Sequence, residues 1–85
     1  MLEQSTRKNK RFMITIQGKT YHFGSATGKT YIDHGDEKKR FNYIKRHQVR
    51  EDWTTVNPGS LSRWILWGDS PDIETNLKAF LERIK

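Results

Sequence analysis

The chain has 85 residues and a mass of 10.1 kDa, which leaves room for one small domain and excludes a second folded unit. It contains no cysteine, which excludes a disulfide framework and a thiolate zinc site, and its longest apolar run, 64–67, is far shorter than the roughly 20 residues of a membrane span. With 16 basic against 10 acidic side chains the formal net charge is +6, so we expect a soluble, basic protein that is neither membrane-bound nor secreted.

Basic side chains are dense in the first residues of the chain, where no apolar pattern is present. Residues 1–11 carry four cations among polar neighbours, and this composition is typical of a flexible basic arm. We therefore expect the arm to lie outside a single folded domain that spans residues 12–85.

The segment 12–23 alternates apolar and polar residues on both sides of a central glycine. A two-residue turn at Gly18-Lys19 would pair Ile16 with Tyr21 and would place the apolar residues of both strands on one face. This pattern predicts a β-hairpin. A third strand is predicted at 30–33, after a loop that contains two glycines.

A helix is predicted from Asp36 to about Arg50, with Asp36 at its positive N-terminal end. At about 100° per residue, Phe41 and Ile44 fall on one face, which we expect to pack on the core. The opposite face is then a basic stripe with one tyrosine, made of Lys39, Tyr43, Arg46 and Arg50. This stripe is expected to face solvent.

The second half of the chain holds two further predicted helices. Residues 59–67 are apolar on nearly all sides and should form the centre of the core, with Arg63 lying over a tryptophan face or paired with a carboxylate. Ser70 and Pro71 are expected to begin an amphipathic helix that runs to the end of the chain. The predicted fold class is α+β: a small antiparallel sheet, a hairpin plus a third strand, packed against about three helices.

Charge is distributed unevenly along the chain. Residues 1–50 hold 12 basic and four acidic side chains, a net charge of +8, whereas residues 51–85 have a net charge of −2. A basic half favours a polyanionic partner, and the absence of a base-reading motif favours nucleic-acid binding with little sequence specificity. The predicted nucleic-acid-binding residues are Arg7, Lys8, Lys10, Arg11, Lys29, Lys39, Tyr43, Arg46 and Arg50. A solvated helix face is the alternative interpretation of the stripe.

Motifs for catalysis are weak. The segment Gly24–Thr30 ends in Gly-Lys-Thr, but three residues separate its glycines where a phosphate-binding loop has four, and a strand is predicted to follow. His22, His34 and His47 show no i,i+4 zinc-binding spacing, and His34 with Asp36 is best interpreted as a strand-to-helix turn with capping side chains. We therefore predict no enzyme activity, no cofactor, no metal and no small-molecule substrate.

Several short motifs between residues 12 and 80 carry a family resemblance. They are Phe23-Gly24-Ser25, Tyr31 with His34 and Asp36, Arg46-His47, Glu51 with Trp53, and Ser62-Arg63-Trp64-Ile65-Leu66-Trp67. Together they resemble a family of small uncharacterised proteins encoded by large double-stranded DNA viruses of eukaryotes, such as phycodnavirus-like and mimivirus-like genomes. The resemblance implies a viral source and no mechanism.

Three hypotheses of function follow. The first is a non-enzymatic viral protein that binds nucleic acid inside the virion or the infected host cell. We expect this nucleic acid to be DNA. The alternative is a minor structural, capsid-associated virion protein that bridges larger capsid proteins through its tryptophan-rich segment and its N-terminal arm. The third, a metal-dependent nuclease, would need a further ligand close to His34 and Asp36.

Overall fold

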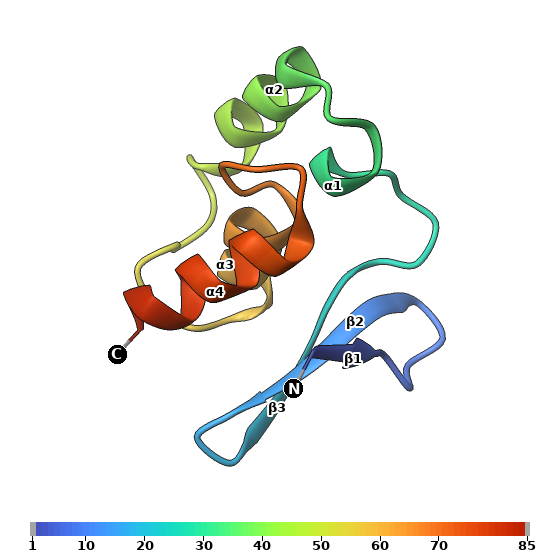
Figure 1. Ribbon diagram of the computed structural model, residues 1–85, viewed down its shortest axis with the longest axis vertical. Coiled ribbons are helices and arrows are strands. Elements are labelled where there is room, and N and C mark those ends of the chain that lie inside the picture. The colour runs from blue at the N-terminus through green and yellow to red at the C-terminus, as the bar shows by residue number, and fades with distance from the viewer. Residues whose placement is uncertain (1, 85) are drawn as a thin grey trace.

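A three-stranded antiparallel sheet and the helices that follow it make up residues 2–84, the part of the chain that the computed structural model describes (Figure 1). The strands are β1 (Leu2–Gln4), β2 (Lys10–Ile16) and β3 (Lys19–Ser25), in the order β1-β2-β3. The helices are α1 (Tyr31–His34), α2 (Glu37–His47), α3 (Pro58–Leu61), the π-helix η1 (Ser62–Leu66) and α4 (Ile73–Arg83). The α+β fold class is confirmed.

The sheet lies at one end of the molecule and α2 at the other, with α3 and α4 between them (Figure 1). None of the helices within residues 2–84 has the length and apolar character needed to cross a membrane.

The hairpin of β2 and β3 is confirmed, but its turn lies one residue earlier than predicted. Gln17 and Gly18 both have positive φ, as a type I′ turn requires, so Ile16 pairs with Lys19 and Ile14 with Tyr21. Relative to the prediction, the partner of each β2 residue is shifted by two positions along β3. An even shift keeps the apolar side chains on the predicted face.

The N-terminal residues are part of the sheet, which corrects the expectation of an arm outside the domain. Leu2 pairs with Ile14 and Gln4 with Phe12, and β2 begins at Lys10. Strand β2 pairs with β3 along one edge, and the short strand β1 pairs along the other edge. The third strand thus comes from the N-terminus.

The segment 30–33, predicted as that third strand, instead leads into α1. The carboxylate of Asp33 accepts hydrogen bonds from the backbone N–H and the hydroxyl of Thr30, at 2.7 and 3.0 Å. The bond from the backbone N–H belongs to a capping box, and Gly35 ends the helix in the left-handed conformation. Local capping therefore overrides the strand-like composition of this segment.

The centre of the core is α3 with η1, as the apolar segment 59–67 predicted. Leu61 and Ile65 are fully buried, and Leu66 packs closely against the sheet. A Cβ on Gly24 would lie 2.8 Å from Leu66 Cδ1, and Gly24 also has a φ of +82°. Glycine at this position lets β3 approach η1.

Helix α2 is rotated relative to the prediction: of its two predicted core residues, Ile44 packs against the core and Phe41 does not, and Asp36 caps the helix as expected. Phe41 is 63% exposed, whereas Tyr43 is only 8% exposed and stacks on Trp67 with ring centroids 4.3 Å apart. Arg40, on the same inward side, donates to the Trp67 carbonyl. Aromatic stacking and a guanidinium that caps backbone carbonyls, rather than aliphatic packing, set the orientation of α2.

Arg63 lies between tryptophans, as predicted. Its guanidinium carbon is 5.2 Å from the Trp53 ring centroid and 4.1 Å from that of Trp64, and Nη1 donates to the Trp67 carbonyl. The apolar stripe of α4 also packs on the core as predicted, although its cap is Asp72 rather than Ser70.

Acid is expected to weaken the contact that holds α1 to the sheet. Arg11 donates two bonds of 2.7 Å to Asp33, and they hold the pKa of Asp33 well below its ordinary value of 3.8. A lowered folded-state pKa stabilises the fold above about pH 4, and this contribution is lost as the pH falls further. Asp33→Asn should therefore destabilise the protein by about 1 kcal/mol at pH 7 and by progressively less below pH 4 in urea unfolding.

The control is Arg11→Ala, which removes the other partner of the same ion pair. Its deficit in unfolding free energy should shrink over the same acid range. A deficit for Asp33→Asn that stays constant from pH 7 to pH 2 would contradict the assignment.

Candidate anion-binding site

A concavity of about 510 Å³ lies between α2 and the residues that precede and end α1, and we call it the basic pocket. Its lining residues are Lys29, His34, Lys39, Asn42, Lys45, Arg46 and Trp67. Four permanent cations and one amide therefore share a pocket whose lining includes no carboxylate. Such a site favours an anion that can accept several charge-assisted hydrogen bonds.

Three of the predicted nucleic-acid-binding residues meet in the basic pocket. Lys39 and Arg46 come from α2, and Lys29 reaches it from the connection between β3 and α1. The spacing on α2 explains the first pair, because residues about seven apart share a helix face. The position of Lys29 depends on the path of the β3–α1 connection, which spacing does not show.

The other predicted residues lie elsewhere. Arg11 is paired with Asp33, and Tyr43 is buried by its stacking, which corrects the expectation that it faces solvent beside a ligand. The remaining predicted residues are exposed or half-buried outside the basic pocket: Arg7 and Lys8 between β1 and β2, Lys10 in β2, and Arg50 after α2.

Asn42, Lys45 and His34 were missed by the sequence reasoning. Asn42 and Lys45 follow Lys39 at intervals of three, so the helical face of Lys39 already contained them. They were passed over because the face was centred on Tyr43, which points inward.

The junction of α1 and α2 is held by side-chain caps, which confirms the predicted capping role of His34 and Asp36, although the turn joins two helices rather than a strand and a helix. The backbone N–H of Asp36 donates to His34 Nδ1 at 2.9 Å, and the Asp36 carboxylate accepts from the N–H groups of Lys38 and Lys39. These bonds lower the pKa of Asp36. They also position the start of α2, where Lys39 faces the basic pocket.

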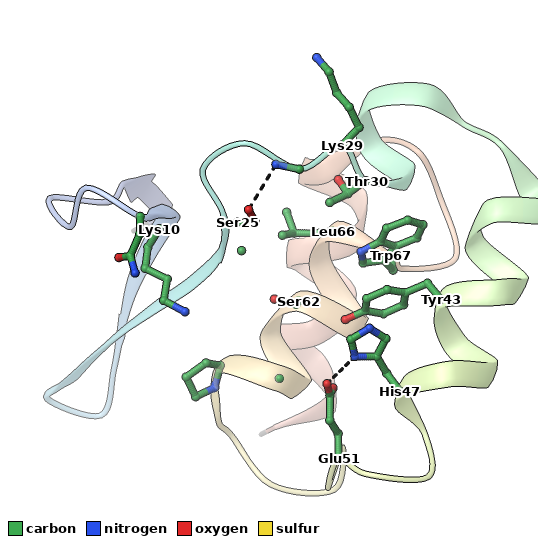
Figure 2. Close-up of a pocket in the computed structure, with 15 residues that line it drawn as sticks. Lys10, Ser25, Lys29, Thr30, Tyr43, His47, Glu51, Ser62, Leu66 and Trp67 are labelled. Atoms are coloured by element: carbon green, nitrogen blue, oxygen red, sulfur yellow. Dashed lines mark hydrogen bonds and ion pairs between the residues drawn. The ribbon is translucent and has the colours of Figure 1, made fainter.

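A second concavity of about 450 Å³, the polar cleft, opens between the sheet and α2. Figure 2 shows Lys10 entering from the sheet, Tyr43 and His47 from α2, and Ser62 and Leu66 from η1. The full lining is Asn9, Lys10, Gly24, Ser25, Gly28, Lys29, Thr30, Tyr43, His47, Glu51, Pro58, Gly59, Ser62, Leu66 and Trp67. Lys29 and Trp67 also line the basic pocket, so the two concavities adjoin.

A hydrogen-bonded pair forms one wall of the polar cleft. Glu51 Oε2 lies 2.6 Å from His47 Nδ1, and Glu51 Oε1 accepts from Trp53 Nε1 at 2.9 Å. Burial alone would raise the pKa of Glu51, but the bonds from His47 and Trp53 outweigh it and the pKa is lowered. Burial raises the pKa of the Tyr43 hydroxyl, so it stays protonated.

Metal ligands do not gather in residues 2–84. Over that range no three histidine or carboxylate side chains lie close enough together to hold an ion. The third hypothesis, a metal-dependent nuclease, therefore lacks the ligand set it requires within the described chain.

A protein-family model described as a family of unknown function (DUF5754) matches residues 1–47, more than half of the chain. Comparison with curated proteins and with solved structures finds no match. The matched segment contains the sheet, α1 and α2, and thus every cation that lines the basic pocket. The chain belongs to this family of unknown function, DUF5754.

Proposed function

We propose that the protein binds nucleic acid through the basic pocket, with little dependence on base sequence and without catalysing a reaction. The observation that carries this proposal is the convergence of four permanent cations on one concavity whose lining includes no carboxylate. Phosphate groups are accepted by lysine and arginine donors whatever the attached base, so such contacts position a strand without reading it.

The cations of the basic pocket are available to a ligand. Within residues 2–84, none of Lys29, Lys39, Lys45 and Arg46 forms a salt bridge, whereas Arg11 and Arg40 are each paired with an aspartate. Like charges held around one concavity repel each other, and a bound anion relieves that repulsion. The four side chains therefore favour anion binding over a structural role.

A polymer of phosphates suits the site better than an isolated anion. Arg7, Lys8 and Arg50 are exposed outside the basic pocket, and the net charge of +8 on residues 1–50 is spread over the sheet and α2. A single phosphate would reach the pocket alone, whereas a strand can contact the pocket and these outlying cations together. Binding should then depend strongly on salt.

The double variant Lys39→Glu, Arg46→Glu tests the proposal. Each phosphate contact to a single strand contributes about 0.7 to the slope of log affinity against log salt, so removing two should reduce the slope by about 1.4. At 0.1 M salt this corresponds to an affinity loss of about 25-fold. Fluorescence anisotropy of a labelled 12-nucleotide strand between 50 and 300 mM salt measures both quantities.

The matched control is Lys19→Glu, Lys78→Glu, which changes the net charge equally with two exposed lysines outside the pocket. It should lose much less affinity than the pocket variant, and circular dichroism should show both variants folded. Equal losses would mean that overall charge rather than the pocket binds the strand, and an absence of salt-dependent binding in the wild type would refute the proposal.

A further inference from the structure

We infer that the polar cleft holds one unstacked nucleoside of a single-stranded nucleic acid whose phosphates lie in the adjoining basic pocket. The inference rests on the proposed function and goes beyond it, because it assigns the form of the nucleic acid and a second binding site. It predicts that the protein contacts a base or sugar as well as phosphates.

The first argument is the arrangement of the two concavities. Lys29 and Trp67 line both concavities, so a ligand that extends beyond one concavity reaches the other beside these two residues. In Figure 2 the Lys29 side chain points away from Tyr43 and His47, while the backbone around it borders the polar cleft. Lys29 therefore lies at the border of the two concavities, and a strand that passes it can contact both.

The second argument is the chemistry of the polar cleft. His47 Nδ1 is engaged by Glu51, but its Nε2 has no hydrogen-bond partner in the described chain. The side-chain hydroxyl of Ser62 likewise has no partner there, and the Tyr43 hydroxyl stays protonated and lines the same space. Donors and acceptors are thus both present, as the edges of bases and the hydroxyls of sugars require.

Apolar surface accompanies these polar groups. Leu66, Trp67 and Pro58 contribute to the lining, and Gly24 and Gly59 expose backbone to it. An aromatic base presents the same combination of an apolar face and a polar edge. The charged residues of the lining are two lysines, Lys10 and Lys29, and one carboxylate, Glu51, which is already bonded to two partners.

The size of the cleft favours a single strand. About 450 Å³ lies within the range of roughly 300–1,000 Å³ that is typical of pockets for small organic molecules. The bases of a duplex are stacked and paired inside a convex rod and cannot enter such a concavity, whereas a single strand can turn one base outward at little cost.

The test compares a 12-nucleotide single strand with an abasic strand of the same length, which carries the same phosphates without bases. Contact with one base should make the normal strand bind about tenfold more tightly. RNA and DNA versions are both measured, and the inference requires the base-dependent difference in at least one. A duplex of the same sequence offers its phosphates alone, so filling the cleft should leave its affinity unchanged.

Variants that fill the cleft complete the test. Ser62→Phe places a ring where Ser62 faces the cleft, and Ser25→Trp does so from the exposed last residue of β3, in case the first variant unfolds. Either folded variant should bind normal and abasic strands equally and should keep the wild-type affinity for the abasic strand.

The two proposals fail in distinguishable ways. If normal and abasic strands bind the wild type equally and the Lys39→Glu, Arg46→Glu variant weakens both, the nucleoside site is refuted and phosphate binding stands. A base-dependent difference that persists in both filled variants also refutes the polar cleft as its origin. If no strand binds, both proposals are refuted.

Discussion

Replacement of Trp67 by alanine is expected to lower the free energy of unfolding by about 3–5 kcal/mol, the usual cost of removing a large buried aromatic side chain. Only 9% of Trp67 is exposed. Its indole stacks on Tyr43 with an interplanar angle of 5° and meets the His34 ring at 5.5 Å in an edge-on contact. Alanine would remove both contacts and open a cavity between α2 and η1.

Urea unfolding followed by circular dichroism measures this loss, and Trp67→Phe is the control. Phenylalanine retains a ring for Tyr43 and should cost about 1–2 kcal/mol, because less apolar surface is lost. The backbone carbonyl of Trp67, which accepts from Arg40 and Arg63, is unchanged in both variants. Equal stability of the alanine and phenylalanine variants would show that the stack contributes little.

Periodicity predicted the elements whose inward side chains are apolar. In α4, Leu77 and Phe80 are buried, and in the hairpin Ile14 and Phe23 are buried on the predicted face. These side chains differ sharply in polarity from their neighbours, so a period of 3.6 or 2 identifies the inward face. The hydrophobic effect alone is enough to orient such elements.

The same rule failed for α2 because its inward side chains are polar or amphipathic. Tyr43, His47 and Arg40 face the core, while Phe41 is exposed. Each inward side chain has a specific contact: Tyr43 stacks on Trp67, Arg40 donates to backbone carbonyls at the end of η1, and His47 Nδ1 bonds Glu51. Partners from distant parts of the chain cannot be inferred from hydrophobicity.

The prediction of a third strand at residues 30–33 was wrong for a related reason. Residues 30–33 have strand-like composition, but a capping box between Thr30 and Asp33 and the ion pair from Arg11 stabilise α1 instead. The S/T-x-x-D spacing is visible in the sequence and could have indicated a helix start. The strand at residues 2–4 is too short and polar for its pattern to be recognised.

The candidate site was predictable in composition but not in geometry. Charge counting identified Lys29, Lys39 and Arg46, and the structure brings them together. It also separates cations by role: Arg40 is bound to backbone carbonyls and Asp69, and Arg11 to Asp33. Net charge makes no distinction between a cation that holds the fold and one that remains for a ligand.

The largest effect of a single polar substitution is expected at Asn76, which is 3% exposed. Its Nδ2 donates to the carbonyls of Ile65 and Ser70 at 2.9 and 2.6 Å, and its Oδ1 accepts from the Ser70 N–H at 3.1 Å. The end of η1 leaves carbonyls without helical partners, and Asn76 satisfies one of them while fixing the connection to α4. A Cβ on Gly68 would lie 2.6 Å from Asn76 Cγ, so this connection has no space to rearrange.

Asn76→Leu keeps the approximate volume but leaves these backbone groups without partners. At about 1–3 kcal/mol for each buried polar group left unsatisfied, the variant should lose about 3 kcal/mol or more, which would lower the melting temperature by more than about 10 °C. Asn42→Leu makes the same chemical change at an exposed position of α2 and should cost less than about 0.5 kcal/mol. If thermal unfolding shows equal losses for the two variants, water must satisfy the Ile65 and Ser70 groups, and Asn76 does not secure η1 to α4.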